Sequence, residues 1–141
     1  MTPATQVLAA APAAMPDGDG RLRVLQLLER HGVQHLVVGD PGATVGALSV
    51  VVAPFARNVD RLCAALKALG ARRRAPGGST QGAPLDYDEL RAKTSKVWML
   101  ATEHGAVDVA TSGPDGRSYG ELLLDTVPRE LRPGLVVELA A

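Results

Sequence analysis

Two valine-rich runs that stand close together in the sequence constrain the fold more than any other feature. The first, residues 33–38, reads VQHLVV, and the second, residues 48–53, reads LSVVVA. Strands with one face in water alternate apolar and polar side chains, whereas strands covered on both faces are continuously apolar. Val50, Val51 and Val52 are consecutive, so the second run predicts a strand that is covered on both faces.

In the sequence, one amphipathic helix is expected before these two strands and another after them. Residues 21–31, RLRVLQLLERH, carry leucines at helical spacing, and residues 58–69, NVDRLCAALKAL, present one apolar face. Asn58 is a residue type that favours the N-cap position, and Gly70 is typical of the position that follows a helix end. The second segment is therefore predicted to begin at Asn58.

The second half of the chain predicts shorter elements. Residues 85–93 have the composition of one or two helical turns, and residues 97–102 and 107–110 flank a glycine-containing turn, which is typical of a β-hairpin. Residues 118–125 begin with a serine followed three residues later by glutamate, which predicts a capped helix. A last strand is expected at residues 135–139. This order of elements predicts an α/β or α+β fold, with a small mixed β-sheet flanked by helices.

Composition limits the kind of protein that this chain can be. Its 141 residues fit one domain, expected at residues 19–141, and residues 1–18 are rich in Ala, Pro and Gly and predict a flexible tail. Lys plus Arg and Asp plus Glu each number 15, which argues against a broad nucleic-acid or membrane surface. The single cysteine, Cys63, precludes a disulfide within the chain and fits a reducing cytosol. We therefore expect a cytoplasmic protein that does not bind membranes or nucleic acid.

Four segments resemble the small nucleotidyltransferase-fold proteins, which are minimal relatives of DNA polymerase β. They are LLERHGVQHLVVGD at residues 27–40, VVVAPFARNVDRLCAALKALGARRR at 50–74, LATEHGAVDVA at 100–110 and SYGELL at 118–123. The resemblance runs from about Arg21 to Leu139. It implies that the two valine-rich strands are neighbours, with the strand that contains Val107 beside them.

The resemblance also implies where an active site would lie. Nucleotidyl transfer needs Mg²⁺ held by carboxylates, two of them at positions i and i+2 of one strand, and a glycine turn whose N–H groups approach the triphosphate. The glycine turn falls on Gly39 and Asp40, the paired acids fall on Ala47 and Ser49, and the third acid falls on Asp108. Only Asp108 keeps the expected acid, and the charge of Asp40 would repel a triphosphate.

These departures favour a catalytically degenerate nucleotidyltransferase-like domain that acts as a binding or regulatory module. Its partner would be another protein or a second copy of the chain. Gly39, Ser49 and Arg72 are the residues that we expect to contact a nucleotide if one binds. The alternative is an active transferase that moves a nucleoside monophosphate onto a protein, RNA or small molecule, with Mg²⁺ and a nucleoside triphosphate bound by Asp108 and Asp40.

Each candidate residue also has a purely structural interpretation. Asp108 alternates with valines and can be a polar residue on the open face of a hairpin. Asp40 can accept a local hydrogen bond in an Asp-Pro-Gly turn, and the basic run at residues 72–74 can be a solvated strand edge. Asp86 and Asp88 have the spacing of a metal-binding pair, but they precede helix-forming residues, where acids favour a helix N-terminus.

Overall fold

The computed structural model describes residues 17–39, 47–74, 84–113 and 115–140 of the chain. The helices are α2 (Asp17–Arg30), α3 (Ala56–Ala68), α4 (Tyr87–Ala92) and α5 (Tyr119–Leu123). The strands are β1 (His35–Val38), β2 (Leu48–Val52), β3 (Arg72–Arg73), β4 (Trp98–Thr102), β5 (Gly105–Ala110), β6 (Thr126–Arg132) and β7 (Leu135–Ala140). The first helix includes the last two residues of the tail expected at residues 1–18, and residues 1–16 lie outside the described part.

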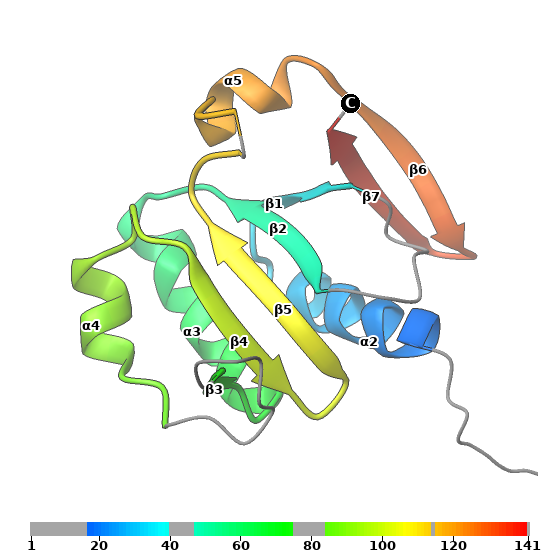
Figure 1. Cartoon of the computed structure of the whole chain (residues 1–141). Helices are drawn as coiled ribbons and strands as arrows, with labels where there is room; N and C mark the ends of the chain where they lie inside the picture. The colour runs from blue at the N-terminus through cyan, green and yellow to red at the C-terminus, as the bar shows by residue number, and fades with distance from the viewer. Residues whose placement is uncertain (1–16, 40–46, 75–83, 114, 141) are drawn as a thin grey trace, which may run out of the picture.

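The strands form a mixed sheet of the predicted class, in the order β3-β4-β5-β2-β1-β7-β6. The two valine-rich strands β1 and β2 are antiparallel neighbours, and β5 lies parallel to β2 on its other side. The neighbour relations predicted for these three strands are therefore confirmed. β7 pairs parallel to β1, and the C-terminal hairpin β6–β7 therefore forms one end of the sheet, with β6 at its edge (Figure 1).

Helices α2 and α3 cover one face of the sheet and enclose the main core (Figure 1). Side chains from α2, such as Leu25 and Leu28, and from α3, such as Leu62 and Leu66, pack against alternate strand residues. Cys63 belongs to this core and is 1% exposed. The apolar stripe of each predicted helix is thus the stripe that is buried.

The second face of the sheet is covered only in part. Leu122 of the short helix α5 packs on Leu36 of β1 and Val51 of β2. The predicted capping box is present, because Ser118 accepts a hydrogen bond from the Glu121 N–H and the Glu121 side chain accepts one from the Ser118 N–H. With α5 on one side and α2 and α3 on the other, β2 is covered on both faces over its C-terminal half, as its run of valines predicts.

Asn58 does not cap α3, and this prediction was wrong. The helix begins at Ala56, with Phe55 at the N-cap position and no side-chain cap. Asn58 is instead fully buried and bonds to two strand ends. Its Oδ1 accepts a hydrogen bond from the Gln34 N–H at 2.6 Å, and its Nδ2 donates to the Gln34 and Ala53 carbonyl oxygens at 3.0 and 2.8 Å.

Strand β6 was not predicted from the sequence. The strand is exposed along most of its length and contains Pro128 and several charged residues. Proline cannot donate a ladder hydrogen bond and is found mainly on edge strands, and charges discourage pairing with other chains. An edge strand of this composition has no apolar alternation that could reveal it.

Replacement of Asn58 by alanine should lower the free energy of unfolding by about 2–3 kcal/mol, because it removes the Asn58 partners of the Gln34 N–H and of the buried Ala53 carbonyl oxygen. The Gln34 carbonyl oxygen keeps a second partner, the Ala53 N–H. Urea denaturation monitored by circular dichroism measures this. Gln34→Ala is the matched control: the bonds use only the backbone of Gln34, whose side chain is exposed, so its stability should stay close to that of the wild type. Equal effects of the two substitutions would contradict this role of Asn58.

Two helical glycines should respond to alanine in opposite directions. A Cβ at Gly20 in α2 would overlap the carbonyl oxygen of His104, whereas a Cβ at Gly120 in α5 would meet no atom. Gly20→Ala should therefore destabilise the protein by about 1–3 kcal/mol through overpacking. Gly120→Ala should stabilise it by about 0.5–1 kcal/mol through the higher helix propensity of alanine. Thermal unfolding of both variants measures the difference, and stabilisation by Gly20→Ala would contradict the close approach.

Candidate functional site

Three of the predicted site residues meet at one end of the central strands. Ser49 of β2 pairs with Val38 of β1 on one side and with Asp108 of β5 on the other. Directly paired residues of neighbouring strands point to the same face of a sheet. Gly39 directly follows Val38, so the register places Gly39, Ser49 and Asp108 near one another.

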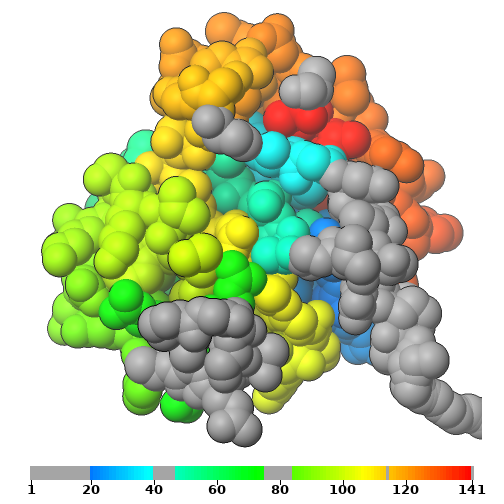
Figure 2. Space-filling model, in the orientation of Figure 1, coloured from blue at the N-terminus to red at the C-terminus, as the bar shows by residue number. Residues whose placement is uncertain are grey.

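The side chains of Ser49 and Asp108 lie on the face of the sheet opposite α2 and α3. Leu48 and Val50 flank Ser49 and are buried in the helix-covered core, so Ser49 points away from that core. Valines 107 and 109 do the same for Asp108. In Figure 2, which views this open face, atoms of β1, β2 and β5 reach the surface between α5 above and α4 at the left.

Gly39 has the backbone conformation that its residue type allows. Its φ is +84°, and a Cβ built on it would meet no neighbouring atom within 4 Å. A positive φ is strained for residues with a side chain, so the glycine is required by the turn itself. This requirement holds whether or not the turn binds a ligand.

Asp108 is bound to an arginine that the sequence did not single out. The Arg74 Nη2 lies 2.5 Å from the Asp108 Oδ1, and the two side chains are 15% and 29% exposed. The Arg74 N–H donates to the Met99 carbonyl oxygen at 3.0 Å, so Arg74 extends the pairing of β3 with β4 by one residue. Its side chain then crosses β4 to reach β5. The backbones of β3 and β5 are two strand spacings apart, roughly 10 Å.

The basic run at residues 72–74 divides between the two faces of the sheet. Arg73 pairs with Leu100 and lies on the helix-covered face, where its guanidinium is 5.5 Å from the ring centre of Trp98. Arg72 alternates with it and lies on the open face, at the exposed edge strand. Arg72 is therefore on the same face as Asp108. It pairs with Ala101, which pairs with Ala106, so it is not level with Asp108 and Ser49.

The metal ligands that nucleotidyl transfer requires are incomplete in this part of the chain. Mg²⁺ is bound by several oxygen ligands, and the residue that pairs with Asp108 on the neighbouring strand is Ser49, which has no carboxylate. Among the described residues, no group of three or more His, Cys, Asp or Glu side chains could hold a metal ion. Asp40, the other predicted ligand, lies outside the described residues.

The acid pair at Asp86 and Asp88 has a structural role. Asp86 is the N-cap of α4, and its side chain accepts hydrogen bonds from the N–H groups of Asp88 and Glu89 at 3.0 and 3.1 Å. The Asp88 side chain is exposed and pairs with Arg91 of the same helix. Both acids therefore stabilise a helix N-terminus, which is the structural interpretation of their spacing.

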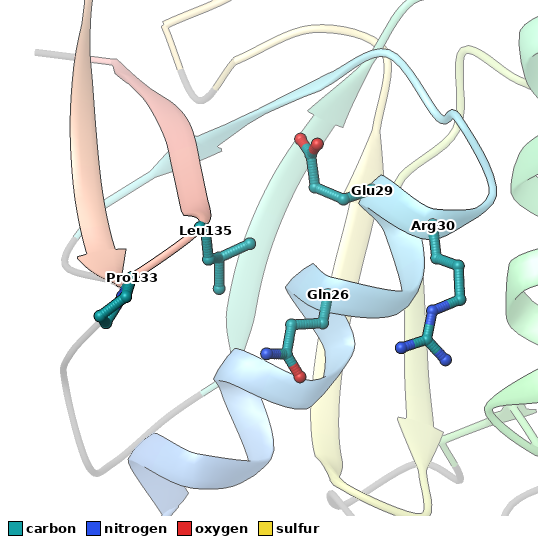
Figure 3. A pocket seen from close by; sticks show the side chains of 6 residues that line it. Gln26, Glu29, Arg30, Pro133 and Leu135 are labelled. Carbon is teal, nitrogen blue, oxygen red and sulfur yellow. The ribbon is translucent and has the colours of Figure 1, made fainter.

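A concave region lies between α2 and the turn of the β6–β7 hairpin. It is an open groove of about 310 Å³ lined by Gln26, Glu29, Arg30, Pro133, Gly134 and Leu135. Figure 3 shows the Glu29 and Arg30 side chains pointing in different directions, with Arg30 directed away from the hairpin. The polar groups do not converge on a common point, so the groove is a weaker candidate site than the open face of the sheet.

His35 is a buried titratable group at the start of β1. It is 8% exposed, and its Nδ1 lies 2.8 Å from the Val33 carbonyl oxygen, which can only accept, so Nδ1 carries the proton. No partner for its Nε2 is found among the described residues. Burial lowers the pKa of His35 below its ordinary value of 6.5, although the Val33 carbonyl and the charge of Glu29 oppose this shift.

Comparison with known proteins adds no assignment, since no protein-family model and no curated protein matches this chain. None of the helices in the described ranges is long and apolar enough to cross a membrane.

His35 should make the protein less stable at mildly acidic pH. Unfolded histidine takes up a proton below about pH 6.5, whereas folded His35 stays neutral to lower pH, so the unfolded state binds more protons in this range. The free energy of unfolding should therefore fall as the pH decreases from 7 toward 5, by up to about 1.4 kcal/mol per pH unit. Urea denaturation at a series of pH values measures the slope.

The matched variant for this measurement is His35→Asn. An asparagine amide can still donate to the Val33 carbonyl oxygen but does not titrate, so the variant should lose most of the pH dependence in this window. A slope that is equal in His35→Asn and in the wild type would show that other groups cause it.

Proposed function

We propose that this chain is a nucleotidyltransferase-like domain that does not catalyse metal-dependent nucleotidyl transfer and acts as a binding or regulatory module. One observation carries the proposal: the position that faces Asp108 on the neighbouring strand holds Ser49, a hydroxyl, in place of a second carboxylate. A hydroxyl supplies a weak neutral ligand, so the charge that would hold a divalent cation is missing.

The arrangement of the strands supports the nucleotidyltransferase-like part of the proposal. The order β5-β2-β1, with β1 antiparallel and β5 parallel to β2, has the neighbour relations that the resemblance implies. The glycine turn at Gly39 and the acid Asp108 also lie at the same end of these strands, where such a site is expected.

The partner is expected to be another protein or a second copy of this chain, in the cytoplasm. An open sheet face with a paired Arg74 and Asp108 and with Met99, which is 56% exposed, offers mixed polar and apolar groups to a partner. The buried, unpaired thiol of Cys63 is compatible with a reducing compartment.

The test is a transfer assay with each of ATP, GTP, CTP and UTP, labelled on the α-phosphate, with and without Mg²⁺. We expect no incorporation of nucleotide into the protein or into added RNA. Calorimetric titration of the same nucleotides should show no binding that depends on Mg²⁺. Mg²⁺-dependent incorporation that disappears in Asp108→Ala would refute the proposal and establish the active transferase.

A further inference from the structure

We propose that the Arg74 guanidinium takes the place of a divalent cation at Asp108, so that two separate features, Arg74 and the missing carboxylate at Ser49, each prevent metal binding. This inference rests on the proposed function, because it explains how the site is kept without metal. It identifies Arg74 as a built-in counter-ion of the open sheet face.

The contact of Arg74 with Asp108 occupies the carboxylate directly. Nη2 lies 2.5 Å from Oδ1, a close contact between opposite charges, and the Arg74 side chain is only 15% exposed. A cation that bound Asp108 would have to displace this guanidinium. It would also have to lose water molecules of its own, which Mg²⁺ does reluctantly.

The position of Arg74 is held by the backbone as well as by the ion pair. Its N–H donates to the Met99 carbonyl oxygen, and Met99 is the residue that pairs with Asp108 on the next strand. Arg74, Met99 and Asp108 are therefore aligned across three neighbouring strands, and the Arg74 side chain begins level with Asp108. A long, fully ionised side chain is needed to cross the intervening strand, and arginine meets both conditions.

The geometry on the other side of Asp108 would suit a second ligand. Ser49 and Asp108 are directly paired on adjacent parallel strands, which lie about 4.8 Å apart. Carboxylates at both positions could reach one cation from the same face. With Arg74 present, however, a carboxylate at position 49 would gain a cationic partner that is already in place and would not need a metal ion.

The experiment is a double-mutant cycle of Ser49→Asp and Arg74→Met, with Mn²⁺ binding measured by the loss of the free-ion electron paramagnetic resonance signal. Methionine keeps much of the arginine stem but has no charge. We expect weak binding by the wild type and by both single variants. The double variant should bind Mn²⁺ at least about tenfold more tightly than Ser49→Asp alone, because only it has two unpaired carboxylates.

Three further variants make the result specific. Arg117→Met combined with Ser49→Asp removes an arginine that pairs with Asp115 and Asp125 elsewhere on the surface, and it should gain no affinity. Asp108→Asn added to the double variant should abolish the gain. Arg74→Gln in place of Arg74→Met gives a second uncharged side chain with hydrogen-bonding capacity, in case the methionine variant does not fold.

Two results would overturn the inference. Binding by Ser49→Asp alone that is as tight as that of a folded double variant would show that Arg74 does not exclude metal. No gain in either folded double variant would show that the two positions cannot share a cation. Neither result concerns the transfer assay on the wild-type chain, so the proposed function is tested independently.

Discussion

The three hydrogen bonds of the Asn58 side chain fix how the two central strands lie against each other. They join Gln34, just before β1, to Ala53, just after β2, and they come from a side chain on α3 that is fully buried. A shift of one residue in strand pairing turns every side chain to the opposite face of the sheet. The register that Asn58 holds therefore also decides that Ser49 faces the open side, in line with Asp108.

On that open side, the local balance of charge distinguishes this chain from a metal-binding site. A single carboxylate is matched by a single guanidinium, and the next strand contributes a hydroxyl. A magnesium site has the opposite balance, since several negative oxygens surround a cation that the protein does not supply. The open face thus has an ion pair without net charge beside a neutral hydroxyl.

The sequence predicted the parts of the fold that depend on local pattern. The run of valines identified β2, leucine spacing identified the helices that enclose the core, and the serine-glutamate spacing identified the cap of α5. It did not predict β6, whose proline and charges suit an exposed edge and carry no apolar period. The prediction of Asn58 as a cap failed because the local preference of asparagine was overridden by the Gln34 N–H and the Ala53 carbonyl oxygen, to which its side chain bonds at the strand ends.

In the candidate site too, some residues could be predicted from the sequence and one contact could not. Positions 39, 49 and 108 could be selected because a family resemblance assigns them, and the register then brought them together. The pairing of Arg74 with Asp108 could not be selected, because it joins residues 34 positions apart across an intervening strand. Three consecutive arginines offer no local signal of which one crosses the sheet.

The position of β7 beside β1 has a consequence for how the chain folds. Val37 pairs with Leu139, so two neighbouring strands of the sheet come from segments that are far apart in the chain. Contacts between such distant segments require the closure of a large loop and form slowly. Until β7 arrives, one edge of the apolar strand β1 is left unpaired. Pairing with β7 covers this edge, and an unpaired apolar strand edge is a place where another chain can pair.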